Sequence, residues 1–252
     1  MELSHRQREI AELARRAGRV TVEALSTRFG VSPQTIRRDL GELCDAELLA
    51  RVHGGAVAAS GAINAAYAQR AADAAAEKEA IGRRCAADIP DGCSLFINIG
   101  TTTEAVARAL LGHRDLMVVT NNLNVAATLA NNPHVEVVVA GGALRRADGG
   151  LIGEATAEFI RQFRLDFAIV GASAVDRDGT LLDYDFREVR VAQAILGNAR
   201  RAWLVTDVSK FHRSAPVRIA GIEALDALYL DREPPEPIAR LCREREVAIR
   251  LP

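Results

Sequence analysis

The feature that most constrains the fold is a set of short, apolar, β-branched runs that alternate with helix-like segments. The runs are SLFINI (94–99), LMVVT (116–120), VEVVVA (135–140), DFAIVGA (166–172), RAWLVT (201–206) and ALDALYL (224–230). Apolar strands alternating with helices predict an α/β domain with a mostly parallel sheet, covered by helices on both faces. Because ligands of such sheets bind at the carboxyl ends of the strands, the residues after each run are candidates for a site.

The first of these strand ends places hydroxyl groups at the start of a helix. Residues 97–110, INIGTTTEAVARAL, predict a strand, a glycine-threonine turn and a helix. Free backbone N–H groups and the positive end of the helix dipole suit a phosphate there. A single junction of this kind is more often only a cap. However, VVTNN (118–122) and VVVAGG (137–142) are similar junctions at the same edge of the predicted sheet, which favours a binding site.

Charged and polar residues follow the later strands. The segments IVGAS, LLDYDFREVR and VTDVSKF supply Ser173, Asp183, Asp185, Glu188 and Lys210. Carboxylates accept hydrogen bonds from polyol hydroxyls, and a lysine supplies countercharge to a phosphate. Between the strands lies AGGALRRADGGLIGEA, which contains Arg145, Arg146 and five glycines. These glycines predict either a loop that closes over a ligand or a solvated hinge.

An alanine-rich stretch divides the chain. Residues 56–76 contain twelve alanines and almost no large apolar side chain, so they cannot anchor a core. Alanine has the highest helix propensity. We therefore expect an N-terminal domain over residues 1–57, a linker over 58–76 that becomes helical, and a larger domain over 77–252.

The N-terminal domain predicts a helix-turn-helix. Residues 3–17 and 22–29 have helical apolar spacing, and Ser32 and Pro33 suit the start of a third helix. At about 100° per residue, the apolar side chains of that helix fall together and face the core: Ile36, Leu40 and Leu43. The polar ones lie opposite or on the flanks: Gln34, Thr35, Arg37 and Arg38. Glutamine can pair with adenine, and arginine with guanine or phosphate, although an arginine pair alone is more often a solvated surface.

A β wing is predicted after this helix. LLARVHGGAV (48–57) has apolar residues followed by a Gly-Gly turn, which suits two short strands. Arg51 and His53 are then placed to reach the DNA backbone or a minor groove. The wing beside a polar helix favours DNA binding over a solvated surface.

VSPQTIRRDL followed by RVHGG resembles the N-terminal domain of the DeoR family of bacterial repressors. The resemblance implies a winged helix-turn-helix that binds double-stranded operator DNA. It assigns operator contacts to the third helix and the wing: Ser32, Gln34, Thr35, Arg37, Arg38, Arg51 and His53. Gly41 departs from the larger polar residue expected there.

The larger domain is similar to the sensor domain of the same family through GTT, TNN, AGG, GEA, GAS, the Asp/Glu segment and SKF. The resemblance implies a relative of phosphosugar isomerases that binds a phosphorylated sugar or polyol. It assigns ligand contacts to ten residues: Gly100, Thr101, Thr102, Thr120, Asn121, Gly171, Ser173, Asp183, Glu188 and Lys210. Asn98 stands where the family has aspartate. FINIGTTTEAVARALL, VTNNLNVAATL, GGLIGEATAEFIRQFRLDF and SKFHR resemble the branch that represses glycerol 3-phosphate metabolism.

Charge and cysteine content bear on DNA affinity, oligomeric state and metal binding. The net charge is −1, and residues 1–60 contribute only +1, whereas a nucleic-acid binder usually has a basic excess. One copy should therefore bind DNA weakly, and we expect a homo-oligomer, by family resemblance a tetramer. Four cysteines without a CxxC pair predict neither zinc nor disulfides. The charged N-terminus and the lack of a run of about 20 apolar residues predict a cytoplasmic protein with no membrane segment.

The leading hypothesis is a repressor, not an enzyme, with no cofactor or metal, that glycerol 3-phosphate releases from operator DNA. One alternative keeps the repressor but makes a sugar phosphate its effector, because the pocket motifs specify phosphate and hydroxyls better than carbon number. The other is a phosphosugar isomerase with an appended helical domain, in which Glu188 is the base and Lys210 the electrostatic stabiliser. The separate N-terminal domain weighs against that alternative, because isomerisation has no use for it.

Overall fold

The computed structural model describes residues 3–17, 19–46, 48–52, 54–58 and 67–252. The chain forms two compact units, Met1–Asn64 and Ala65–Pro252. The first is a winged helix-turn-helix and the second is a parallel α/β domain, which confirms the predicted fold class.

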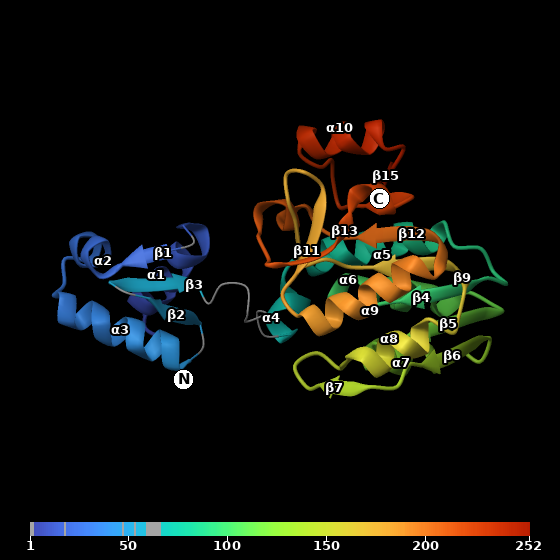
Figure 1. The fold of residues 1–252 in the computed structure, drawn as a ribbon, viewed down its shortest axis with the longest axis horizontal. Coiled ribbons are helices and arrows are strands. Elements are labelled where there is room, and N and C mark those ends of the chain that lie inside the picture. Colours follow the sequence, from blue (N-terminus) through green and yellow to red (C-terminus); the bar gives the residue numbers. More distant parts are fainter. Residues whose placement is uncertain (1–2, 18, 47, 53, 59–66) are drawn as a thin grey trace. The chain divides into compact units, whose positions relative to one another are not determined.

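The N-terminal unit packs helices against a small antiparallel sheet (Figure 1). Its described elements are α1 (His5–Ala17), β1 (Arg19–Thr21), α2 (Val22–Phe29), α3 (Pro33–Asp45), β2 (Leu49–Val52) and β3 (Gly55–Ala58). The sheet has the order β1-β3-β2. Strands β2 and β3 are the predicted wing. Strand β1 was not predicted, because three residues are too few to show an alternating pattern.

The ends of α2 and α3 follow from their capping residues. The Thr21 hydroxyl accepts from the amide of Ala24 over 3.2 Å, and Gly30 ends α2 in the left-handed conformation at φ 62°. The Ser32 hydroxyl caps α3 by accepting from the amide of Thr35 over 3.2 Å. These caps satisfy helix-end groups that would otherwise lack partners, so the predicted start of α3 is confirmed.

The two glycines of RVHGG have different tasks in the wing. Gly54 has φ 76°, a turn conformation that favours glycine. Gly55 pairs with Thr21 of β1, and a Cβ atom on Gly55 would lie 2.0 Å from the Val20 carbonyl oxygen. The sequence therefore lets the wing turn sharply and then lie tightly against β1.

The sensor unit begins with α4 (Tyr67–Ala72) and α5 (Ala75–Ala87) and is built around a parallel sheet of seven described strands. Its strands are β4 (Ser94–Ile97), β5 (Leu116–Thr120), β6 (Val135–Val139), β9 (Leu165–Val170), β12 (Ala199–Val205), β14 (Ala227–Tyr229) and β15 (Ala248–Arg250). The first six correspond to the six predicted runs. Its helices after α5 are α6 (Thr101–Ala109), α7 (Leu123–Leu129), α8 (Glu154–Ile160), α9 (Phe186–Gly197) and α10 (Glu236–Glu244).

Two hydrophobic clusters cover the faces of this sheet. Leu95 and Ile97 of β4 pack in the cluster with α5, α6 and α7, whereas Phe96 packs in the cluster with α8, α9 and α10. This alternation is expected of a strand buried on both faces. A Cβ atom on Gly82 of α5 would lie 2.6 Å from the Ala105 backbone, so glycine lets α5 pack directly against α6.

The strand order contains a change of winding direction in the middle of the sheet. The order is β15-β14-β12-β9-β4-β5-β6. From β4 the chain adds β5 and β6 on one side, then returns to the other side of β4 to add β9, β12, β14 and β15. The direction of winding thus changes between β4 and β9, and ligands of open α/β sheets bind at the carboxyl ends of strands at such a point.

Smaller elements complete the sensor unit. Strands β7 (Ala143–Arg145) and β8 (Gly150–Ile152) form an antiparallel hairpin within the glycine-rich loop. Strands β10 (Ala174–Val175), β11 (Thr180–Asp183) and β13 (Val217–Gly221) form a second small sheet. Short 3₁₀ helices are η1 (Leu110–Gly112), η2 (Val208–His212) and η3 (Ile222–Ala224).

Candidate functional site

The outward face of α3 carries exposed polar side chains. Ser32, Gln34, Arg37 and Arg38 are exposed, and Thr35 is half-buried. Their apolar counterparts Ile36, Leu40 and Leu43 lie in the core of the unit, as predicted. The helix therefore offers solvent a polar strip with the chemistry of a base-reading surface.

Carboxylates behind this strip hold α3 in place. Asp39, which is buried, accepts from the Arg6 guanidinium of α1 over 2.6 Å and 3.2 Å. Glu42 accepts from the Gln7 amide over 2.5 Å and from Arg38 Nε over 3.0 Å. These residues line a surface hollow of about 1040 Å³ between α1 and α3. The side chain of Arg38 is 83% exposed, so its pairing with Glu42 is a surface contact.

The two predicted wing residues differ in what the structure describes. Arg51 belongs to β2 and pairs in register with Ala56 of β3. His53 lies outside the described residues.

In the sensor unit, the loop after β4 leads directly into α6. Gly100 precedes the helix at φ 151°, and the Thr103 hydroxyl lies 2.7 Å from the carbonyl oxygens of both Asn98 and Gly100. The first intrahelical bond is from the amide of Glu104 to Gly100. The amides of the preceding threonines thus have no intrahelical acceptor and are suited to an anion. Thr101 is half-buried and Thr102 is buried.

The loop after β5 supplies a buried amide. The Thr120 hydroxyl donates to the Ile97 carbonyl over 2.6 Å and accepts from the Asn122 amide over 3.0 Å, so it joins β4 to β5. Asn121 is fully buried and its Nδ2 donates to the Leu151 carbonyl over 3.1 Å. Its Oδ1 has no hydrogen-bond partner among the described residues.

Unpartnered oxygens recur at the strand ends. Within the described part of the chain, Asn98 Oδ1, Asn121 Oδ1 and Thr206 Oγ1 are buried without a hydrogen-bond partner. These residues directly follow β4, β5 and β12, whose carboxyl ends meet at one edge of the sheet. A buried polar atom without a partner is costly, so this edge is prepared for a polar ligand or water.

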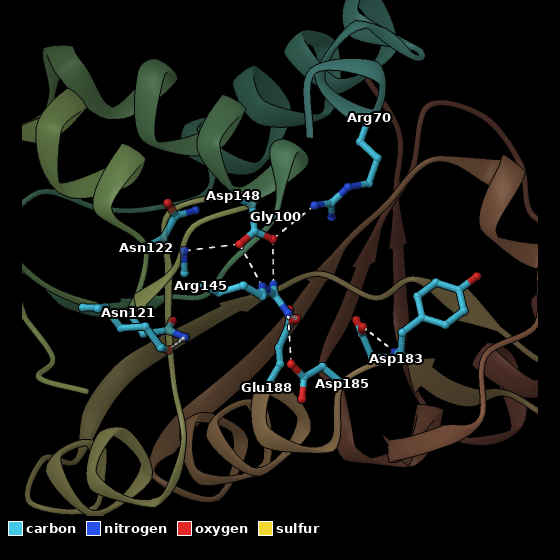
Figure 2. A network of polar contacts seen from close by, with 12 residues as sticks. Arg70, Gly100, Asn121, Asn122, Arg145, Asp148, Asp183, Asp185 and Glu188 are labelled. Atoms are coloured by element: carbon cyan, nitrogen blue, oxygen red, sulfur yellow. Dashed lines mark hydrogen bonds and ion pairs between the residues drawn. The ribbon is translucent and has the colours of Figure 1, made fainter. Parts of the chain in front are cut away.

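Arg145 lies at the centre of an acidic cluster beside this edge (Figure 2). Its guanidinium donates to both oxygens of Asp148 over 2.9 Å and 2.6 Å. The same group forms ion pairs with Glu188 at 2.5 Å and Asp185 at 3.7 Å. The glycine-rich segment is therefore a hairpin that carries an arginine to carboxylates at and near the start of α9.

The carboxyl groups of the cluster have pKa values shifted in opposite directions. Burial raises the pKa of Glu188 to about 8, and the charge of Asp183 adds to that shift. Burial also raises the pKa of Asp183, against the opposing effects of the Tyr184 amide and the Ser173 hydroxyl. Although burial opposes it, hydrogen bonding from Arg145 lowers the pKa of Asp148. Near neutral pH the pocket thus has both donors and acceptors for ligand hydroxyls.

Lys210 lies in the 3₁₀ helix η2, among other cations. Burial lowers its pKa to about 8, and Arg213, Lys78 and Arg70 act in the same direction, against Asp207. An anion between these cations would relieve their mutual repulsion.

Helix α4 also contributes to this region, which sequence patterns did not indicate. The Tyr67 hydroxyl donates to Glu104 over 2.6 Å, and Arg70 pairs with Asp148 at 3.1 Å. Glu104 is buried and also accepts from the Asn122 and Asn124 amides. The only sequence signal was the presence of Tyr67 and Arg70 among alanines.

The ten predicted ligand residues come from several strand-end segments. Figure 2 shows Gly100, Asn121, Asp183 and Glu188 around Arg145 and Asp148. Gly171 and Ser173 follow β9, which lies beside β4 in the sheet. Thr120 differs from the others because its hydroxyl already donates and accepts within the protein.

No described helix is long and apolar enough to cross a membrane. The described residues contain no group of three histidine, cysteine, aspartate or glutamate side chains that could hold a metal. The four cysteines are free, and Cys85 and Cys242 are buried in the two core clusters as packing residues.

Comparison with known proteins identifies both units. Residues 6–61 match the DeoR-like helix-turn-helix domain, and residues 73–232 match the DeoR C terminal sensor domain. The glycerol-3-phosphate regulon repressor of Escherichia coli (strain K12) is 48% identical over 251 residues, covering 100% of both chains. The repressor of the same name from Haemophilus influenzae is 47% identical, covering 100% of this chain and 98% of its own.

Similarity to solved structures is much lower. Ribose 5-phosphate isomerase from Plasmodium falciparum matches with a TM-score of 0.40 and 9% identity, covering 53% of this chain and 52% of its own. A match of that quality carries no functional argument. The full-length relatives named above are transcriptional repressors and not enzymes. With both domain models matched and nearly half of all residues identical to these repressors, the chain belongs to the DeoR family of DNA-binding transcriptional repressors.

Proposed function

We propose that this repressor controls glycerol 3-phosphate metabolism and that glycerol 3-phosphate releases it from its operator. The observation that supports this most directly is the combination, in one chain, of an exposed polar helix in a helix-turn-helix unit and a sheet edge with buried, unpartnered polar atoms. The names of the relatives supply the choice of effector. Effector and operator then oppose each other's binding by the same factor.

The DNA contacts follow from position on α3. Gln34 and Arg38 lie on the outward face and contact base edges, whereas Arg37 on the flank contacts phosphate. The remaining operator contacts come from the start of α3 and from the wing: Ser32, Thr35, Arg51 and His53.

The effector binds across the carboxyl ends of β4, β5, β9 and β12. Its phosphate lies at the first turn of α6, where free amides and hydroxyls meet the positive end of the helix dipole, with Lys210 as countercharge. Its hydroxyl groups reach the Asn121 amide and the carboxyl cluster. The proposed contacts are Gly100, Thr101, Thr102, Thr120, Asn121, Gly171, Ser173, Asp183, Glu188 and Lys210.

The low charge of the DNA-binding unit requires several copies on one operator. Residues 1–60 carry nine basic and eight acidic side chains, and phosphate neutralisation supplies most DNA affinity. We propose a cytoplasmic homo-oligomer, by family resemblance a tetramer, in which each copy adds its own operator contacts.

A gel shift with DNA from upstream of the protein's own gene tests the proposal. It is repeated with glycerol 3-phosphate, three- to six-carbon sugar phosphates, glycerol and inorganic phosphate. We expect glycerol 3-phosphate to release the DNA, and glycerol and inorganic phosphate to have little effect. Release by a hexose phosphate but not by glycerol 3-phosphate would contradict the choice of effector. Failure to bind any regulatory DNA would contradict its operator role.

A further inference from the structure

Helix α4 lies against the turn at which we propose that the phosphate binds. The Tyr67 hydroxyl donates to Glu104 of α6 over 2.6 Å, and the Thr101 hydroxyl lies 3.5 Å from the Arg70 carbonyl oxygen. The Lys78 ammonium, which is buried, also donates to that carbonyl oxygen. These contacts fix the backbone of Arg70 next to the first residue of α6.

The side chain of Arg70 reaches from there to Asp148. Its Nη2 lies 3.1 Å from Asp148 Oδ2, and the side chain is 15% exposed. Asp148 has two other partners, because it accepts from Arg145 over 2.6 Å and from the Gly150 amide over 3.3 Å. Asp148 therefore remains paired if Arg70 moves away (Figure 2).

A phosphate would compete with Asp148 for this guanidinium. Arg70 is close enough to Lys210 and Lys78 to lower the pKa of both, so it already lies among the cations of the proposed phosphate site. A phosphate offers more charge than a carboxylate and suits the planar, forked donor geometry of arginine. Asp148, by contrast, has its charge already matched by Arg145.

We propose that Arg70 is a ligand of the effector phosphate and that it exchanges Asp148 for this phosphate when the effector binds. The inference rests on the proposed function, because it needs a phosphorylated effector at the start of α6.

The exchange predicts effects of opposite sign for the two partners. Arg70→Met removes a phosphate ligand, so the affinity for glycerol 3-phosphate should fall about 10- to 100-fold, as for one charge-assisted hydrogen bond. Asp148→Asn removes the charge that competes for Arg70 and should strengthen effector binding several-fold. In the double variant, Asp148→Asn should no longer strengthen binding, because Arg70 is absent. A merely structural ion pair predicts that both single changes weaken binding.

The experiment is calorimetric titration of the full-length protein with glycerol 3-phosphate, with operator affinity measured by fluorescence anisotropy. Arg161→Met is the matched control, because Arg161 is a half-exposed arginine that pairs with Glu154 on α8, and it should change neither value. Arg70→Lys keeps the charge and should retain more affinity than Arg70→Met. The fluorescence of the single tryptophan, Trp203, reports whether each sensor unit is folded.

Three outcomes separate the inference from the proposed function. If wild type responds to glycerol 3-phosphate but Asp148→Asn weakens its binding, or Arg70→Met leaves it unchanged, the exchange is wrong and the proposed function stands. If Arg70→Met or Asp148→Asn fails to fold, Arg70→Lys decides: a reduced affinity for glycerol 3-phosphate with unchanged stability supports a phosphate ligand, and an unchanged affinity contradicts it. If wild type binds operator but responds to no phosphorylated ligand, the proposed effector function itself fails.

Discussion

The arginines of α3 and those of the sensor pocket have the same charge in opposite surroundings. Arg38 is 83% exposed and pairs with Glu42 of its own helix. Arg145 is 16% exposed and pairs with Asp148 of its own hairpin and with Glu188 of α9. An exposed ion pair contributes about 0–1 kcal/mol and is readily exchanged, whereas removing one partner of a buried pair costs about 3–5 kcal/mol. Burial, and not residue type, thus separates an arginine available to DNA from one that organises a pocket.

The strongest test of this contrast removes the buried arginine. Arg145→Met removes the cation shared by Asp148, Asp185 and Glu188, although Asp148 keeps Arg70 and Asp185 keeps Arg187. The free energy of unfolding of the sensor unit should therefore fall by up to about 3–5 kcal/mol, the cost of breaking a buried ion pair. Urea unfolding followed by Trp203 fluorescence measures this unit alone, because Trp203 is the only tryptophan and lies in β12. The control Arg190→Met removes a surface partner of Glu154 and should leave the free energy of unfolding nearly unchanged. Equal losses of unfolding free energy in the two variants would contradict the difference between buried and exposed arginines.

The exposed arginine should affect operator recognition without affecting stability. Arg38→Ala should weaken binding to the specific operator by about 1–3 kcal/mol, because it removes a base contact, and should leave glycerol 3-phosphate binding unchanged. Anisotropy with operator and with random DNA measures the difference. Equal loss on both would make Arg38 a phosphate contact, and the base-reading role would be wrong.

Effector binding should also respond to pH. The pKa of Lys210 is lowered to about 8, mainly by burial and with help from Arg213, so Lys210 loses its charge as the pH rises above 8. The pKa of Glu188 is raised to about 8 by burial, so this residue gains a negative charge over the same range. Both changes disfavour an anion, and effector affinity should fall about tenfold or more between pH 7 and pH 9. Calorimetric titration at several pH values measures this affinity for wild type and for Lys210→Met. The affinity should depend less on pH in the variant.

The smallest effect is expected at the second exposed arginine. Arg37→Ala should weaken binding to operator and random DNA alike, and should reduce the slope of log affinity against log salt by about 1. Gel shifts at several salt concentrations measure both. If Arg37→Ala weakened binding to the operator but not to random DNA, Arg37 would be a base contact and not a phosphate contact.

Local sequence patterns predicted the elements that are defined by neighbouring residues or by a repeated apolar pattern. Apolar runs predicted six strands of the sensor sheet, and Ser32 and Pro33 predicted the start of α3, because helix caps and buried strands depend on neighbouring residues. The three-residue strands β1 and β15 were missed, since their pairing partners supply most of what defines them.

Long-range polar contacts could not be predicted in this way. Arg70 and Asp148 are 78 positions apart, and no spacing rule connects them. Arg145 lies in the glycine-rich segment, but two of its carboxylate partners, Asp185 and Glu188, depend on how β7 and α9 pack. Thr120 shows the converse: it occupies the predicted strand end, yet its hydroxyl is used to join β4 to β5.

The change of winding between β4 and β9 also links effector binding to completion of the chain. The pocket needs residues that follow β4 and β5 as well as residues from β9 onward, so a nascent chain that ends before residue 165 lacks half of it. An effector that binds only the finished sheet stabilises the folded sensor by mass action, by about 2.7 kcal/mol at one hundred times its dissociation constant. The metabolite would then affect how much intact sensor persists in the cell, in addition to whether that sensor holds DNA.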